Sequence, residues 1–398
     1  MTAEPRPATA PAPDPDLLYS EDEAALRDAV RALLTDRCDP ATVLAAIESD
    51  TPYDAALWRS LATEIGTAGL LVPEKLGGAG ASAREAAVVL EELGRAVAPV
   101  PYLTSAVLAV TALLGCDHDN AEVAGALTAL AAGTTVGALA VPLTTAPTGP
   151  SEVPGASGAS GPPEPSVRAA ADGTLTGRVT SVADAAAAGL LLVPARGPDG
   201  PALFAVDASA DGVHTERVTP LDLTRPLAHL TLDGARGRLL AGGDQAREAV
   251  GRALLTGAGL LASEQLGVAE WCLAETVRHT AERTQFGRPV GSFQVLKHRM
   301  AALWLDVASA RAAARNAADA LATGSPDAPV AVAVAQAYCA PVAVRAAEEC
   351  IQLHGGIGMT WEHPAHLFLK RAKGAELALG TPGHHRAALA TLVDLGAP

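Results

Sequence analysis

The sequence predicts an α+β protein in which a helical part, a β part and a second helical part follow one another. Apolar residues recur at helical spacing over residues 17–128 and 242–398, whereas residues 129–241 contain short apolar runs bounded by Gly, Pro and Asp. With 398 residues, of which 49% are hydrophobic, the chain can bury the core of two or three packed units. Few architectures have this order of parts, so the order itself reduces the number of possible folds.

Two helix-start signals mark the first helical part. Ser20 stands three residues before Glu23 and Ser82 three residues before Glu85, which is the capping-box pattern in both cases. Residues 1–16 are rich in Pro and Ala and lack the basic and apolar regions of a signal peptide. We therefore expect a disordered tail over residues 1–16 and a helical domain over residues 17–128.

The β part contains apolar runs at residues 136–141, 189–193 and 202–206, each of a length that fits one strand. Residues 144–165 are so rich in Pro, Gly, Ser and Thr that burial cannot offset the entropy of ordering them. We expect a β domain over residues 129–241 with a mobile loop inside it, followed by a helical bundle over residues 242–398.

Composition excludes several classes of function. Acidic residues outnumber basic ones by 44 to 29, and the net charge of −15 argues against a nucleic-acid partner. The five cysteines are widely spaced without a CxxC pair, which favours free thiols in the cytoplasm over disulfides. No apolar stretch reaches the roughly 18 to 20 uninterrupted residues of a membrane helix, and no P-loop, nucleophile elbow or dinucleotide fingerprint occurs. We expect a cytoplasmic globular protein.

Two motifs in the second helical part give the chain a family resemblance. Residues 283–294 read RTQFGRPVGSFQ and residues 350–358 read CIQLHGGIG, with weaker support from VPEKLGGAG at residues 72–80 and VVLEELG at residues 88–94. Together with the three-part order, these motifs make the chain similar to the acyl-CoA dehydrogenase family over nearly everything after Asp16. The resemblance implies a middle β-barrel or sandwich domain and a C-terminal four-helix bundle.

The resemblance also implies FAD as cofactor. A pyrophosphate is well held by a guanidinium and by backbone amides at glycine, and Arg283 beside a glycine-rich turn fits that requirement. In the family these motifs bind the ADP half of the FAD that belongs to the neighbouring subunit. The cofactor-binding residues implied here are Arg283, Gln285, Phe286, Gln294, Gln352, Gly355, Gly356 and Thr381.

The residue that removes the α-proton in the family is missing. Its usual glutamate position, just before Gly380-Thr381, is occupied by Leu379, and the alternative position on an earlier helix by Gly257. Neither can accept a proton. Glu376 and Glu264 lie near these positions along their helices, but structural or solvent-facing roles are favoured for both. The catalytic residue is therefore unknown from the sequence.

The flavin cradle of the β domain is also altered. Residues 139–147 read LAVPLTTAP where family members that hold their own flavin carry a Thr-Glu-Pro loop, and Thr180 stands about where a tryptophan backs the flavin. In the family, the altered positions bind the subunit's own flavin and substrate, whereas the retained motifs bind the FAD of the neighbouring subunit. This asymmetry resembles the two-subunit acyl-CoA dehydrogenases of actinobacteria, in which a homologous partner chain completes the enzyme.

The resemblance implies an FAD-dependent α,β-dehydrogenation of an acyl thioester, carried on CoA or on a carrier protein, in a homo- or hetero-oligomer. Two alternatives stay open: a non-catalytic scaffold subunit that completes a partner's FAD site, and a flavin monooxygenase on the same fold, which needs no carboxylate base.

Two further clusters of residues are candidates for binding a metal ion or a phosphate group. The histidines near the C-terminus lack the spacing of a metal-ligand framework, so structural or surface roles are favoured and no metal is predicted. For the basic run at residues 370–373, a solvated face is favoured over phosphate binding. The histidines in question are His354, His363, His366, His384 and His385.

Overall fold

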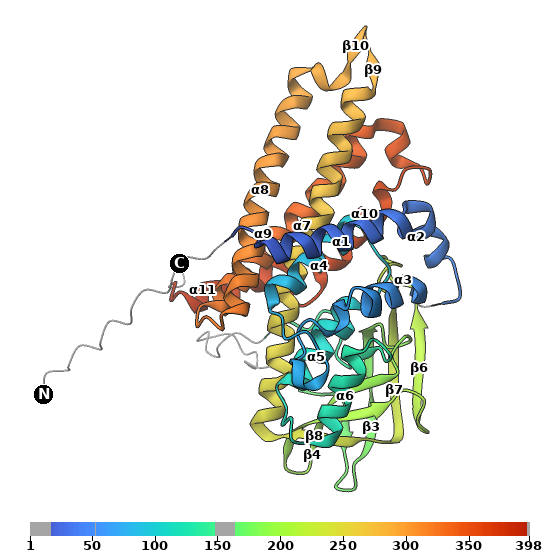
Figure 1. Ribbon diagram of the computed structural model, residues 1–398, viewed down its shortest axis with the longest axis vertical. Helices are drawn as coiled ribbons and strands as arrows, with labels where there is room; N and C mark the ends of the chain where they lie inside the picture. The colour runs from blue at the N-terminus through green and yellow to red at the C-terminus, as the bar shows by residue number, and fades with distance from the viewer. Residues whose placement is uncertain (1–16, 52, 148–163, 396–398) are drawn as a thin grey trace, which may run out of the picture.

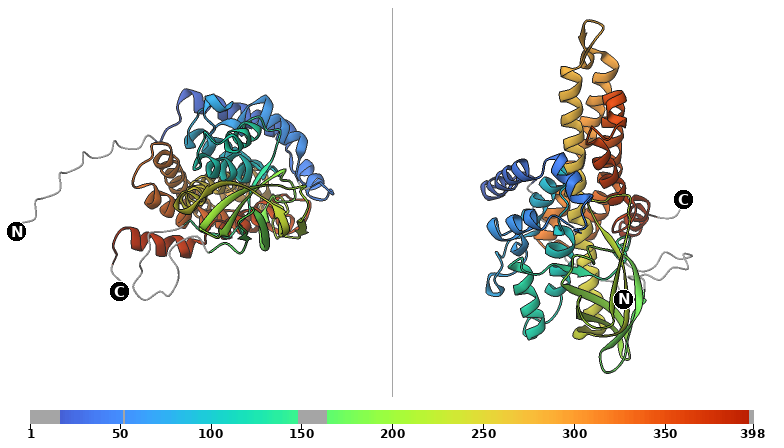
Figure 2. Two further views of the ribbon diagram at one scale, coloured as in Figure 1. Left: turned by 90° about the horizontal axis from the view of Figure 1, so that it is seen from below. Right: turned by 90° about the vertical axis from the view of Figure 1, so that its right-hand side faces the viewer.

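The computed structural model describes residues 17–51, 53–147 and 164–395 (Figure 1). The tail expected over residues 1–16 and most of the loop expected over residues 144–165 lie outside these ranges. A helical N-terminal part packs beside a β domain, and long C-terminal helices extend beyond both (Figures 1 and 2). The predicted α+β fold class is confirmed. The five cysteines are free and buried, as the sequence indicated.

The N-terminal helices begin where the sequence signals predicted. Ser20 and Glu23 form a capping box, with Glu23 N donating to Ser20 Oγ at 3.1 Å and Ser20 N donating to Glu23 Oε2 at 2.7 Å; Ser82 and Glu85 form the second box. The α-helices of this part are α1 (Glu21–Arg37), α2 (Pro40–Ile47), α3 (Ala55–Arg59), α4 (Ala83–Ala96), α5 (Val110–Leu114) and α6 (Ala121–Ala131), with π-helical turns at Ser60–Glu64 and Tyr102–Ala109.

The strands of the β domain form one eight-stranded sheet in the described part of the chain. Its order is β6-β7-β3-β2-β4-β5-β8, with β1 paired to β4 in parallel. Each of the three apolar runs noted in the sequence contributes a strand, namely β1, β4 and β5. The strands are β1 (Gly137–Leu139), β2 (Arg168–Ala169), β3 (Thr174–Ala183), β4 (Leu190–Gly197), β5 (Gly200–Asp207), β6 (Val213–Val218), β7 (Leu227–Arg236) and β8 (Arg238–Gly242).

Long helices form the C-terminal bundle. The helix α7 packs against α8 and α9, and the hairpin β9–β10 joins α7 to α8 at the far tip of the molecule (Figure 1). The elements are α7 (Gly243–Glu282), β9 (Thr284–Gln285), β10 (Arg288–Pro289), α8 (Gln294–Ala322), α9 (Ala328–His354), a 3₁₀ turn (Gly355–Met359), α10 (Ala365–Leu377) and α11 (Pro382–Leu392).

One segment in the described chain, Ala328–Met359, is long and apolar enough to span a membrane by length and composition alone. In the structure it is α9 with the following 3₁₀ turn, and 67% of its most apolar window is buried inside the protein. It packs against α7, α8, α10 and α11. Such packing is that of a core helix.

Glycines allow α4 and α7 to cross closely. A Cβ atom at Gly94 would collide with the carbonyl oxygen of Glu264, and one at Gly267 with that of Glu91. The two helix backbones are therefore in direct contact, which only glycine permits at these positions. This crossing fixes the part of α7 that carries Gly257 and Glu264.

Candidate functional site

The first family motif forms the exposed tip of the bundle. Arg283 ends α7, and Phe286 and Gly287 form a two-residue turn between β9 and β10 in which both residues have positive φ, 54° and 72°. Glycine adopts this conformation freely, but an aromatic residue does so at a cost in backbone strain. The Phe286 side chain is 89% exposed. Its ring meets that of Phe293 edge to face at a centroid distance of 6.1 Å, and the rest of it is open to solvent at the tip.

The second motif lies beside the first. The ring of His279, one turn before Arg283 on α7, is 4.2 Å from that of His354, which immediately precedes Gly355. Arg299 on α8 and Glu349 on α9 are joined at 2.8 Å, so the three helices are held together near the tip. Among the described residues, the implied cofactor-binding residues at this end of the bundle are all exposed: Arg283, Gln285, Phe286, Gln294, Gln352, Gly355 and Gly356.

This end of the bundle fits the ADP half of an FAD. A Cβ atom built at Gly355 or Gly356 would meet no described atom within 4 Å, so the backbone there is open to close approach. Arg283 supplies a guanidinium, and Gln285 and Gln352 supply amide groups that can bind phosphate or ribose oxygens. These residues are exposed at the end of the bundle that extends beyond the other two parts of the chain (Figure 1).

Thr381 lies elsewhere. It is the N-cap of α11 and accepts a hydrogen bond from His384 N at 3.2 Å. Helix α11 lies far from the β9–β10 tip in Figure 1. The structure therefore separates Thr381 from the seven other implied residues.

The two positions that carry the base in the family meet in space. A Cβ atom at Gly257 on α7 would lie 3.1 Å from Leu379 Cδ1, and closer still to Leu108 Cδ2. Leu379 itself is fully buried. The structure thus brings the two alternative positions together, and the space between them is filled by the side chains of Leu108 and Leu379. Glycine and leucine cannot accept a proton, so none of these residues is a candidate for the base.

The surrounding backbone closes the same location. Leu379 N donates to Leu143 O at 2.7 Å, and Leu143 N donates to Ser181 O at 3.0 Å. A Cβ atom at Gly380 would lie 2.9 Å from Ala146 Cβ. The three altered cradle segments, residues 139–147, 175–182 and 379–381, therefore bind one another. The backbone amides of Leu379 and Leu143 are thus bonded within the chain, and these segments offer no carboxylate at the position of the family's base.

His385 anchors the turn that carries Leu379. Its buried ring donates from Nε2 to Leu379 O at 3.0 Å. Burial outweighs the opposing effect of the Leu379 carbonyl and, together with nearby His384, lowers the pKa of His385 to about 4. The ring is therefore neutral at physiological pH.

We predict that this histidine makes stability depend on pH in the acidic range. Its folded pKa lies below the unfolded value of about 6.5, so the unfolded chain binds the extra proton first. Stability is fully present above pH 6.5 and falls as the pH drops towards 4. A His385→Gln variant should show a weaker dependence than the wild type across this window in chemical unfolding curves. Parallel curves for the two proteins would contradict the assignment.

Glu264 is a structural residue, as the sequence favoured. Its carboxylate is fully buried and accepts hydrogen bonds from Arg371 Nε at 2.8 Å and from Arg225 Nη2 at 2.6 Å. Burial raises its pKa, but the two guanidinium groups outweigh that effect and lower it. A carboxylate engaged in this way is a poor base. Glu376, the other candidate, is bonded to Lys373 at 3.2 Å on the surface of α10.

The favoured interpretation of residues 370–373 as a solvated basic face is wrong for Arg371. Its side chain is 3% exposed and also donates to Thr224 O at 3.1 Å and faces Asp222 at 3.5 Å. The buried charges of Glu264 and Asp222 require counter-charges, which explains the burial of Arg371 and Arg225. Sequence reasoning missed this cluster because its members come from three separate elements and show no motif spacing.

We predict that adding a side chain at Gly257 lowers the stability of the protein. In Gly257→Ala the new methyl group must displace Leu108 or Leu379, and overpacking of this kind costs about 1–3 kcal/mol. Gly125→Ala is the matched control, because a Cβ atom there meets nothing within 4 Å on helix α6, and this change should stabilise the protein by about 0.5–1 kcal/mol. Urea unfolding of both variants checks the opposite signs, and equal effects would refute the close packing.

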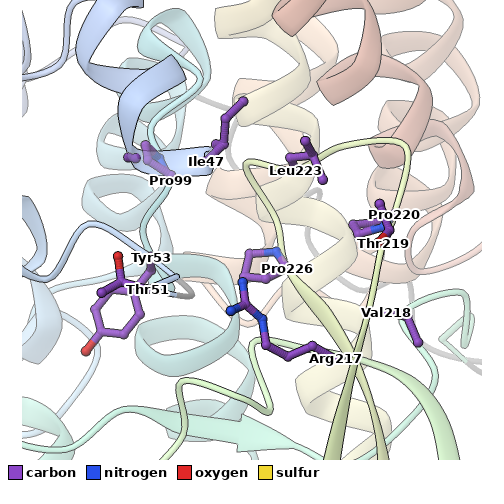
Figure 3. Close-up of a pocket in the computed structure, with 11 residues that line it drawn as sticks. Ile47, Thr51, Tyr53, Pro99, Arg217, Val218, Thr219, Pro220, Leu223 and Pro226 are labelled. Carbon is purple, nitrogen blue, oxygen red and sulfur yellow. The ribbon is translucent and has the colours of Figure 1, made fainter. Parts of the chain in front are cut away.

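A separate pocket of about 370 Å³ lies between the α2–α3 connection and the loop that joins β6 to β7 (Figure 3). Its walls include Tyr53, Thr219 and several prolines, and Arg217 at its edge donates to Asp50 O at 2.8 Å. The pocket contains none of the residues implied in cofactor binding or in proton transfer. We assign no ligand to it.

The three-part fold and the two motifs at the bundle tip are those of the acyl-CoA dehydrogenases, and the chain belongs to this family. Residues 20–118 match the family model described as the acyl-CoA dehydrogenase N-terminal domain, and residues 247–393 match the model of the C-terminal domain. The family resemblance read from the sequence is thereby confirmed. Members of the family bind FAD and catalyse acyl thioester oxidation.

Particular relatives are found in mycobacteria and among heteromeric complexes. Acyl-CoA dehydrogenase IpdE2 of Mycobacterium tuberculosis is 36% identical over 362 residues, covering 91% of this chain and 94% of that protein. A variant of the Tcur3481-Tcur3483 steroid ACAD has 31% identity and a TM-score of 0.81, covering 94% of this chain and 98% of the other. The ChsE4-ChsE5 complex from Mycobacterium tuberculosis has 29% identity and a TM-score of 0.82, covering 96% and 100%.

Proposed function

We propose that this chain is the FAD-completing subunit of a hetero-oligomeric acyl-CoA dehydrogenase. In this assignment a homologous partner contributes the base and the flavin cradle, and the complex catalyses α,β-dehydrogenation of an acyl thioester. The chain itself carries out no proton abstraction.

The packing of Leu379 and Leu108 over Gly257 carries the proposal. Both family positions for the base are apolar and buried, and the backbone around them is bonded to itself through Leu143. A complete homo-oligomeric dehydrogenase would need a carboxylate and an open flavin cradle at this location. The neighbour-facing residues, in contrast, are exposed and open at Gly355 and Gly356. Two similar structures, Tcur3481-Tcur3483 and ChsE4-ChsE5, are each named for two different chains, and this supports a heteromeric assembly.

Each neighbour-facing residue has a distinct task in this proposal. FAD accepts the hydride from the β-carbon of the thioester when it is bound. Arg283 would neutralise the pyrophosphate, and Gly355 and Gly356 would let backbone amides approach it closely. Phe286, held at the tip with positive φ, would pack against the partner and exclude water from the cofactor.

A similar structure supports a proposal for the substrate class. One of the two heteromeric complexes is a steroid ACAD, and we propose that the acyl group here is likewise a steroid-derived thioester of CoA. A bulky ring system would have to be accommodated in the partner's half of the complex, because the corresponding space in this chain is filled by Leu108 and Leu379.

The test is anaerobic reduction of flavin by acyl-CoA, first with this chain alone at saturating FAD and then after mixing with a homologous partner encoded nearby. The proposal predicts no bleaching of flavin absorbance by the chain alone and rapid bleaching by the mixture. Bleaching by the chain alone would contradict it and would require a base other than Glu264. Comparison of a steroid thioester with a straight-chain thioester in the mixture tests the substrate class separately.

A further inference from the structure

A cluster of metal-ligating side chains lies next to the glycine turn. Glu275 on α7, His354 at the end of α9 and His363 just before α10 each direct one ligand atom to a common point, and these atoms lie within 4.8 Å of one another. In the described residues this is the one such group of three. The sequence analysis favoured structural roles for His354 and His363, because the three ligands come from separate elements and lack motif spacing.

His354 is oriented as a metal ligand would be. Its ring is fully buried, and its Nδ1 lies 2.6 Å from Cys350 O, a contact in which Nδ1–H donates to the carbonyl. In the neutral ring this bond places the proton on Nδ1 and leaves the lone pair on Nε2. Nε2 has no hydrogen-bond partner among the described residues. A buried nitrogen without a partner is costly, and metal-bound histidines have this same bond from the opposite ring nitrogen to a carbonyl.

The distances suit a small cation. Glu275 Oε1 lies 3.6 Å from His354 Nε2 and 3.5 Å from His363 Nε2. Two ligands of a tetrahedral Zn²⁺ with bonds of about 2.0–2.1 Å are separated by about 3.3 Å. All three ligand atoms lie within 4.8 Å of one another, so side-chain shifts are needed to close the site. Arg278 binds both carboxylate oxygens of Glu275, Oε2 at 2.8 Å through Nε and Oε1 at 2.5 Å through Nη2, and so orients the carboxylate as outer partners of metal-bound carboxylates do.

We propose that Glu275, His354 and His363 bind a divalent transition-metal ion of the Zn²⁺ class. Two imidazoles and one carboxylate are a ligand set that Zn²⁺ accepts, with a fourth position left for water or for the neighbouring imidazole of His279. The ion would tie α7 to the turn between α9 and α10. Since Gly355 follows His354 directly, the metal would hold the glycine turn in place.

A histidine binds a metal ion through a neutral ring, so binding releases any extra ring proton. One contact must change: Ala365 N donates to His363 Nδ1 at 3.3 Å, and metal binding through Nε2 puts the ring proton on Nδ1. Ala365 opens α10, where the first N–H groups have no intrahelical partner and can bind water instead.

The test uses the full chain without a histidine tag, freed of metal by a chelator. Titration with Co²⁺ should give the visible absorption bands of a tetrahedral site, saturating at one ion per chain, and Zn²⁺ should displace Co²⁺ and remove the bands. Glu275→Gln and His363→Gln should each weaken Co²⁺ binding at least about 10-fold. His384→Gln is the matched control, because His384 is exposed and lies on α11, outside the cluster, and it should leave binding unchanged.

Zn²⁺ should also raise the unfolding temperature of the wild type but not of Glu275→Gln, because a ligand that binds the native state stabilises it. Metal-free variants that unfold at the temperature of the metal-free wild type confirm that the substitutions leave the fold intact. Absence of the Co²⁺ bands in the wild type would overturn the proposal. So would bands that survive both substitutions, or that His384→Gln removes as well.

Discussion

Replacing Arg371 with methionine is expected to lower the free energy of unfolding by about 3–5 kcal/mol, because the change leaves buried charge without its counter-charge. The Arg371 side chain satisfies both oxygens of Glu264, at 2.8 and 3.0 Å, and lies 3.5 Å from Asp222. Arg225 alone would remain against two carboxylates that are excluded from water. Urea unfolding monitored by circular dichroism measures the loss.

The matched control is Arg345→Met. Arg345 is paired to Asp306 at 2.6 Å, but its side chain is 52% exposed and the pair is in contact with water. Exposed pairs contribute about 0–1 kcal/mol, so this variant should unfold nearly as the wild type does. A loss for Arg371→Met as small as that of the control would show that the Glu264 cluster does not stabilise the fold.

Replacing Arg283 with methionine in the hetero-oligomer is expected to weaken FAD binding by about 10- to 100-fold. Hydrogen bonds to charged groups contribute about 1.5–3 kcal/mol, and each 1.4 kcal/mol corresponds to a factor of ten. Arg283 is exposed at the tip, so its loss should leave the stability of this chain unchanged. Fluorescence titration of the apo-complex with FAD gives the affinity.

Arg247→Met serves as the control for this experiment. Arg247 lies on the same helix, α7, near its other end and is paired with Asp244 on the surface. It is remote from the tip, so its replacement should leave FAD affinity unchanged. An Arg283→Met complex that binds FAD as tightly as the wild type would remove Arg283 from the cofactor site.

Local signals in the sequence predicted most of the fold. The capping boxes at Ser20 and Ser82 and the apolar runs of β1, β4 and β5 each act over a few residues, so a single sequence reveals them. Counting within a known family pattern identified Leu379 and Gly257 as the two alternative positions of the base, and the structure places them side by side. The reason is that family motifs fix the register of the helices around them.

Contacts between distant segments could not be predicted in this way. The burial of Arg371 depends on Glu264 and Asp222, which lie on other elements, and a basic run alone appears solvated. The same holds for the cluster of Glu275, His354 and His363, whose members have no regular spacing. The bond from Leu379 to Leu143, which closes the cradle, joins a helix end to a loop of the β domain. Such pairings follow from topology rather than from local pattern.

In the function that we propose, this chain completes a partner's FAD site and holds no flavin of its own. The most direct test is the number of FAD molecules per chain in the purified hetero-oligomer, from flavin absorbance after denaturation and the protein concentration. We predict one FAD for each pair of chains. One FAD for every chain would mean that the cradle closed by Leu143 and Leu379 opens in the complex, and would contradict the assignment.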